Sequence, residues 1–247
     1  RPVILAAYRA SRVERLPDDQ RGLLELAAVI GTEFSLGALR ALAGAHASVP
    51  SLLEGMRRKE LVEPTGTYWG DEPVHRFHHV LIRDAAYRRL LKTTRADLHE
   101  RVAVWTDRAA ANLIGEHETV IAYHYEQAYQ YHRELGTVDD HASGLGRRAA
   151  ELLAIAARRA LGRDDLPASG GLAGRALDLL SEADATARAE LLLIGCECLL
   201  ASGDVAAARP LVEQLLRVAR GDAGLGAWAA CFDAELVGLT DPQGLVA

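Results

Sequence analysis

The chain has 247 residues, 49% of them hydrophobic, and a formal net charge of −6. This length is enough for one large or two modest domains, and the abundance of Ala and Leu favours helices over sheets. The charge is uneven, since residues 1–92 carry 14 Lys+Arg against 11 Asp+Glu, whereas residues 93–247 carry 14 against 23. A protein that binds nucleic acid along its whole length is therefore excluded, because that class needs a basic surface throughout.

The sequence also bears on the cellular location of the protein. No apolar run reaches the roughly 18–20 residues that cross a bilayer, and no signal peptide is visible, so we expect no membrane contact. Three cysteines without framework spacing indicate reduced thiols and a cytoplasmic location. The chain starts at Arg1 rather than Met, which suggests a fragment of a longer protein.

The first third of the chain predicts three short helices. The first is expected to follow Asp18 and Asp19, which we interpret as its caps. Ser35 is expected to cap the second helix, and Pro50 to open the third.

A β-hairpin is predicted after these helices. Leu61–Pro64 and Val74–Phe77 read as its strands, with Gly66 and the pair Gly70-Asp71 at its tip. Three helices and a two-stranded hairpin together predict a winged helix.

The third helix ends in the basic cluster Arg57, Arg58 and Lys59. Winged helices often place this helix in the DNA major groove, so the cluster is a candidate DNA contact. Cations at a helix C-terminus also favour the macrodipole, and groove-reading side chains usually lie nearer the N-terminal part of the helix. The cluster is therefore a candidate contact either with DNA or with a neighbouring domain.

Val80–Leu91 predicts an apolar helix preceded by His78 and His79. No Asp, Glu or Cys stands at a spacing that would support a metal ligand or a base, so we interpret the histidines as packing or capping residues. A later helix, Glu118–Tyr131, carries a polar-aromatic band. Tyr123, His124 and Tyr129 are its candidate ligand face, where a sugar or base could stack; the alternative is that these rings pack at a helix–helix seam.

The last part of the chain has a weak internal period. Asp165, Asp204 and Asp241 lie 39 and 37 residues apart, each after an apolar helix and at a turn. Small and large residues then alternate on paired helices, as in tetratricopeptide repeats with a looser period. Such repeats stack into a superhelix with a concave binding face.

Motifs for catalysis are lacking in the sequence. The chain has only two lysines, Lys59 and Lys92, and neither follows a glycine, so no phosphate-binding P-loop is present. We find no GxSxG, HExxH or paired CxxC motif either. The sequence therefore predicts no catalytic residue and no metal ligand in this segment.

Residues 16–128, about half of the chain, resemble the arm that follows the ATPase module in bacterial signal-transduction ATPases with numerous domains. These proteins include adenylate-cyclase-linked forms and LuxR-type transcription regulators. His78 stands where they more often have Arg. The matching residues are Leu16-Pro17, Ala28–Gly31, Phe34-Ser35, Leu61–Glu63, Phe77, His79, Leu81–Tyr87, Leu90-Leu91, His99, Ala103 and Ala122–Tyr125.

The resemblance implies a mainly α chain with four segments. These are a linker or helix from a missing ATPase module (1–18), a winged helix (19–92), a connecting helical hairpin (93–135) and tetratricopeptide-like repeats (136–247). It also implies a non-catalytic regulatory or sensor arm. ATP and Mg²⁺ would bind to the missing upstream module, which His79 and the 57–59 cluster would contact, while a small-molecule inducer or a protein would bind to the repeats.

Two alternatives stay open. The chain could be a winged-helix DNA-binding regulator with a helical dimerisation tail, or a protein-binding scaffold of helical repeats. The sequence does not identify the inducer, the output domain or the oligomeric state.

Overall fold

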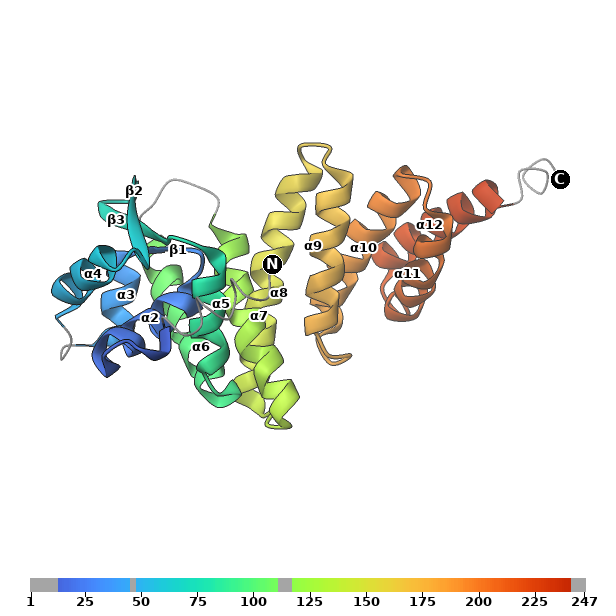
Figure 1. The fold of residues 1–247 in the computed structure, drawn as a ribbon. Helices are drawn as coiled ribbons and strands as arrows, with labels where there is room; N and C mark the ends of the chain where they lie inside the picture. Colours follow the sequence, from blue (N-terminus) through green and yellow to red (C-terminus); the bar gives the residue numbers. More distant parts are fainter. Residues whose placement is uncertain (1–12, 45–47, 111–116, 241–247) are drawn as a thin grey trace, which may run out of the picture. The chain divides into compact units, whose positions relative to one another are not determined.

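The computed structural model describes residues 13–44, 48–110 and 117–240 (Figure 1). Most of these residues lie in helices, which confirms the mainly α prediction. The chain forms two compact units. The first contains the described residues before 116 together with Gln127–Ala142, and the second contains residues 117–126 together with those from Ser143 onward.

The first unit combines helices with a small sheet. Its elements are α2 (Asp18–Ile30), β1 (Glu33–Ser35), α3 (Leu36–Ala43), α4 (Val49–Arg58), β2 (Val62–Trp69), β3 (Glu72–Phe77), α5 (Val80–Arg89), α6 (Lys92–Ala110) and the later part of α7 (Glu118–Leu135). Residues 93–110 lie in the same compact unit as the sheet; the division into four segments stays a prediction.

The sheet has three antiparallel strands in the order β1-β3-β2. The predicted hairpin is present and turns at Gly70-Asp71. Strand β1 is an addition to the prediction, and its Phe34 lies opposite His75. Gly66 is not at the hairpin tip as predicted. It has a φ of 77° inside β2, where the register shifts between Pro64 and Tyr68, so it forms a bulge.

The predicted caps of the first unit have mixed outcomes. Ser35 caps α3, because its hydroxyl accepts a hydrogen bond from the Ala38 N–H at 3.1 Å. Asp18 and Asp19 do not cap α2 as predicted; Pro17 occupies that position and the aspartates lie in the first turn, where they favour the macrodipole. His79 caps α5 by accepting from the Leu81 N–H at 3.1 Å, which confirms its capping role.

An apolar core packs α2 to α5 against the sheet, and a second cluster of Val29, Leu42, Leu98 and Val102 packs α6 on α2 and α3. Phe34 is the aromatic centre of the apolar core, packed edge-on against Phe77 with ring centroids 5.5 Å apart. The other large side chains that are almost fully buried in this core are Leu24, Leu39, Met56, Leu61 and Ile82.

The second unit is entirely helical in its described part (Figure 1). It contains the first residues of α7, most of α8 (Asp140–Leu161), and then α9 (Leu166–Leu179), α10 (Ala185–Ala201), α11 (Val205–Val218) and α12 (Ala223–Thr240). Successive helices pack closely. A Cβ added at Gly170 of α9 would lie 3.3 Å from the Cβ of Cys198 on α10, which is a tight contact.

The same turn joins α8 to α9 and α10 to α11, 39 residues apart. Asp164 and Gly203 both adopt positive φ, 57° and 74°. The following aspartates, Asp165 and Asp204, accept a hydrogen bond from a backbone N–H three residues on, at 3.1 Å in both cases. The backbone bonds that end α8 recur at the end of α10. The repeat predicted from these aspartates is therefore present as a repeated turn; Asp241 lies outside the described residues.

Substitution of Gly203 tests whether this turn needs a residue that adopts positive φ without strain. Gly203→Ala puts a Cβ into the left-handed region, so the free energy of unfolding should fall by about 1 kcal/mol. Gly174 lies inside α9 with no atom within 4 Å of an added Cβ, so Gly174→Ala should raise it by about 0.5–1 kcal/mol. Denaturant unfolding followed by circular dichroism measures both. A shift of the same sign for the two variants would contradict this account of the turn.

Candidate functional site

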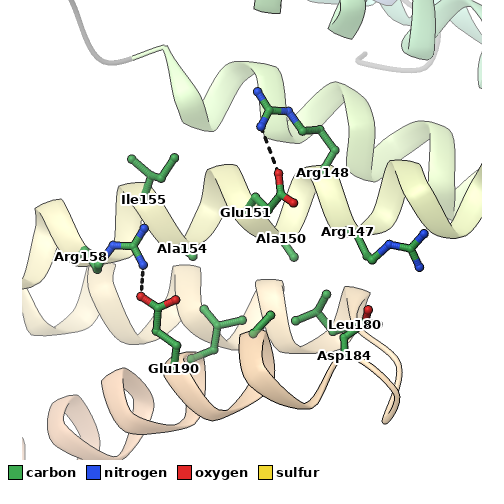
Figure 2. A pocket seen from close by; sticks show the side chains of 12 residues that line it. Arg147, Arg148, Ala150, Glu151, Ala154, Ile155, Arg158, Leu180, Asp184 and Glu190 are labelled. Carbon is green, nitrogen blue, oxygen red and sulfur yellow. Dashed lines mark hydrogen bonds and ion pairs between the residues drawn. The ribbon is translucent and has the colours of Figure 1, made fainter.

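The second unit has a groove of about 360 Å³ between α8 and the start of α10 (Figure 2). We call it the α8–α10 groove. Ala and Leu side chains form much of its wall, and charged side chains stand along it. Its lining residues are Arg147, Arg148, Ala150, Glu151, Ala154, Ile155, Arg158, Leu180, Asp184, Ala187, Glu190 and Leu191.

The charged residues of the α8–α10 groove differ in their partners. Arg148 donates to the Glu151 carboxylate at 3.1 Å, within α8. Arg158 of α8 pairs with Glu190 of α10 and so bridges the two helices (Figure 2). Arg147 has no hydrogen bond or ion pair with any described residue, although it stands in the same groove. It is therefore the arginine of the groove that can accept an anionic ligand without losing an existing contact.

Asp184 is the acidic residue closest in sequence to the start of α10. Its carboxylate accepts from the backbone N–H of Ser181 at 3.0 Å and from its hydroxyl at 2.7 Å. Since both bonds stay within the loop between α9 and α10, they hold the rim of the groove in one shape.

Arginines also hold the walls of the groove in place. Arg188 of α10 donates to the carbonyl oxygens of Leu177 and Leu180, at 3.3 and 3.2 Å, and so satisfies the C-terminal end of α9. On the other side, the buried Ser169 hydroxyl of α9 donates to the Ala157 carbonyl of α8 at 2.9 Å. The helices that form the groove are thus tied by bonds outside it.

The first residues of α7 are fixed to α8 in the second unit. Arg159 donates to both carboxylate oxygens of Glu118, at 2.8 and 3.0 Å. Burial alone would raise the pKa of Glu118, but the hydrogen bonds from Arg159 and from the backbone N–H of Glu118 itself, together with the charges of Arg159 and His117, lower the pKa below its usual value. The carboxylate therefore stays charged, as a two-point contact requires.

The aromatic band predicted as a ligand face does not form one exposed surface. His124 is buried, with 2% of its surface exposed, whereas Tyr123 on the same helix is exposed. Tyr129 is half-buried. Six residues separate Tyr123 from Tyr129, which puts them on different sides of α7. Ligand binding by these three residues stays a prediction, and their placement fits the packing alternative.

Residues of the sequence resemblance meet in a polar cluster in the first unit. The Tyr87 hydroxyl of α5 hydrogen-bonds to His99 Nε2 of α6 at 2.8 Å and to the Tyr131 hydroxyl of α7 at 2.7 Å. Guanidinium groups cover the Tyr87 ring, with Arg95 at 4.5 Å and Arg83 at 4.8 Å from its centroid. We call this the Tyr87 cluster.

The Tyr87 cluster is half-buried, with His99 at its buried end, and it contacts the backbone of α2. His99 is fully buried, and Arg83 Nε donates to the Ala28 carbonyl of α2 at 3.0 Å. The cluster therefore connects α2, α5, α6 and α7 through polar contacts. Sequence analysis took Arg83, Tyr87 and His99 only as matching positions; the helical spacing of four between Arg83 and Tyr87 is a signal that they share a face.

The basic cluster at the end of α4 is only partly available. Arg57 pairs with Glu54 of the same helix at 3.0 Å, and Lys59 Nζ donates to the Gln20 side chain at 2.7 Å. Arg58 is exposed and has no partner among the described residues. Whether these residues contact DNA or another domain stays a prediction.

Sequence analysis did not single out Arg147. A usable signal exists, because Arg147, Ala150, Ala154 and Arg158 follow helical spacing along one face of α8. That a groove lies between this stripe and the start of α10 is a tertiary fact, which the spacing does not contain.

The described part of the chain has neither a cluster of metal-ligating side chains nor a helix that could cross a membrane. Among residues 13–44, 48–110 and 117–240, no three His, Cys, Asp or Glu side chains gather as a metal site would need. Over the same residues, no helix combines the length and apolar character needed to span a bilayer.

Comparisons with known proteins give one structural match. Neither a protein-family model nor a curated protein matches the sequence. A solved structure of a signal transduction ATPase with numerous domains, with a tetratricopeptide repeat sensor, from Pyrococcus horikoshii is similar, at 14% identity and a TM-score of 0.39. The match covers 93% of this chain and 36% of that one, so the chain spans about a third of that protein's length.

Loss of the Tyr87 hydroxyl should destabilise the first unit. Tyr87→Phe removes both bonds to buried or half-buried partners, so we expect the free energy of unfolding to fall by about 1–3 kcal/mol. Tyr131→Phe should cost less, about 0.5–1.5 kcal/mol. Tyr129→Phe is the matched control, since the Tyr129 hydroxyl has no bond to a described residue. Thermal unfolding of the four proteins tests the order, and equal stability of Tyr87→Phe and the control would contradict it.

Proposed function

We propose that this chain is the non-catalytic regulatory and sensor arm of a multidomain, ATP-dependent signalling or transcription regulator. The parent would be of the LuxR type or linked to an adenylate cyclase. The observation that carries the proposal is the Tyr87 cluster. Residues that match these proteins in separate motifs, Arg83 and Tyr87 in one and His99 in another, converge on one bonded group.

The first unit is, on this proposal, a winged helix. Support comes from its element order, with one helix, a short strand, two helices and then a hairpin. The sheet order β1-β3-β2, with both neighbouring pairs antiparallel, fits the same fold. A winged helix here would contact an upstream ATPase module that binds ATP and Mg²⁺, with His79 and Arg58 as candidate contacts.

The second unit would act as the sensor. The turn repeated after 39 residues supports tetratricopeptide-like helix pairs. The α8–α10 groove supports a binding role, because it is concave, is lined by both apolar and charged side chains, and contains an arginine without a partner among the described residues. An inducer or protein bound there would shift the parent between two domain arrangements, if it contacts one arrangement better than the other.

An interdomain role suits α4 better than reading of DNA. Ser48, Ser51 and Leu52, in its N-terminal part, line one hollow together with Asp18 and Asp19. Those carboxylates would repel phosphates at the place where a recognition helix usually meets the bases. Arg57 is also occupied by Glu54.

Removal of this arm should change ATP turnover by the parent. We expect the steady-state rate of the full-length protein to change at least about twofold when residues 13–240 are deleted, because the arm would bias the module between resting and active states. ATP binding to the truncated protein is the control for an intact module. Unchanged turnover with intact ATP binding would contradict the regulatory role.

The chain itself should bind duplex DNA only weakly. We expect a dissociation constant no tighter than the non-specific range, roughly 10⁻⁴–10⁻⁶ M, and no effect of Arg58→Ala. Fluorescence anisotropy at two salt concentrations measures this. Tight, salt-dependent binding that is lost in the Arg57→Ala, Arg58→Ala double variant would favour the DNA-binding alternative instead.

A further inference from the structure

The α8–α10 groove offers one free cation to a ligand. Arg148 and Arg158 are engaged with Glu151 and Glu190, whereas Arg147 has no partner among the described residues. In Figure 2 the Arg158–Glu190 bridge lies at one end of the groove and Arg147 at the other. A ligand that enters the groove therefore finds an unpaired guanidinium at one end only.

The uncharged residues of the groove wall are all apolar. Ala150 and Ala154 of α8, with Leu180 and with Ala187 and Leu191 at the start of α10, supply side chains without polar atoms. None of the twelve lining residues is Asn, Gln, Ser, Thr or Tyr. A peptide that lay in the groove would lose water from backbone groups and find few neutral partners for them, which costs free energy. The lining suits a ligand whose polar atoms are confined to one end.

The size and the acidic residues limit the ligand further. A volume of about 360 Å³ is at the small end of ligand sites. Glu151, Asp184 and Glu190 also line the groove, so a second negative charge on the ligand would meet carboxylates. A ligand with a single negative charge, placed at Arg147, has no second charge to face these carboxylates.

We propose that the α8–α10 groove binds a small apolar monocarboxylate, with its carboxylate on Arg147 and its hydrocarbon or aromatic part against Ala150, Ala154 and Leu191. The proposal rests on the proposed sensor role and names the chemical class that the sensor takes. Two parallel N–H donors make a guanidinium a good partner for a carboxylate.

Octanoate and 4-phenylbutyrate are the probes for this proposal. Titration of the ¹⁵N-labelled chain with each should shift the amide signals of Ala150 and Ala187 and the Arg147 side-chain signal, with a dissociation constant on the order of 1 mM. Octylammonium has the same chain with the opposite charge, and octanedioate carries a second carboxylate. Both should bind at least about fivefold more weakly than octanoate.

Two variants test the contacts of the ligand separately, one for its carboxylate and one for its hydrocarbon part. Arg147→Met should weaken octanoate binding about five- to tenfold, because it removes a charge-assisted bond. Arg209→Met is the matched control, since Arg209 is an exposed arginine of α11 outside the groove. Ala187→Phe fills the groove from an exposed position of α10 and should abolish the shifts while the fold is kept.

The outcomes are decisive in either direction. Shifts confined to groove residues and lost in Arg147→Met, but kept in Arg209→Met, would support the site. Absence of binding by both probes, or binding unaffected by Arg147→Met, would overturn it. If octanoate binds in the groove but the arm has no effect on ATP turnover by the parent, the binding site stands and the proposed regulatory function fails.

Discussion

The second unit depends on one local constraint, the turn that closes each helix pair. A residue with positive φ reverses the chain, and the next residue, an aspartate, satisfies a free N–H at the start of the following helix. Successive pairs then pack against each other closely, since a Cβ added at Gly170 of α9 would lie 3.3 Å from the Cβ of Cys198 on α10. The α8–α10 groove is the space that remains between the first helices of successive pairs.

Arginines join helices in both units; in the first, Arg89 of α5 pairs with Glu25 of α2 and Arg101 of α6 donates to the Leu42 carbonyl of α3. In the second unit they join helices through carboxylates and carbonyl oxygens, as Arg159 does with Glu118 and Arg188 with the end of α9. In the first unit Arg83 and Arg95 also lie over the Tyr87 ring, where the positive charge is balanced partly by the face of the ring. Arg147 takes neither role, which is why it stands out as a ligand contact rather than a structural one.

Local features could be predicted from the sequence, whereas contacts between distant segments could not. Ser35, His79, Asp165 and Asp204 act within three residues of themselves, and their capping roles follow from local chemistry. Strand β1 was missed because three residues carry no periodicity, and its pairing with β3 spans about forty residues. Gly66 was misplaced because a bulge and a turn both demand positive φ.

In the candidate site, too, local features could be predicted from the sequence and contacts between distant segments could not. The stripe of small residues on α8 is visible in the sequence, but the groove beside it depends on where the start of α10 lies. The Tyr87 cluster likewise needs Tyr131, which is 44 residues away in the chain. Histidines and tyrosines near one another in sequence, such as Tyr123 and His124, point to opposite environments instead.

The positions of the cysteines have a practical consequence. Burial raises the pKa of Cys196 to about 12, so its thiol stays protonated and unreactive near neutral pH. Cys198 is buried as well, whereas Cys231 is exposed on α12. Of the three cysteines in the sequence, a thiol-reactive dye would thus label one. The native chain already carries a single attachment point for fluorescence or spin-label measurements in its helical-repeat unit, without any substitution.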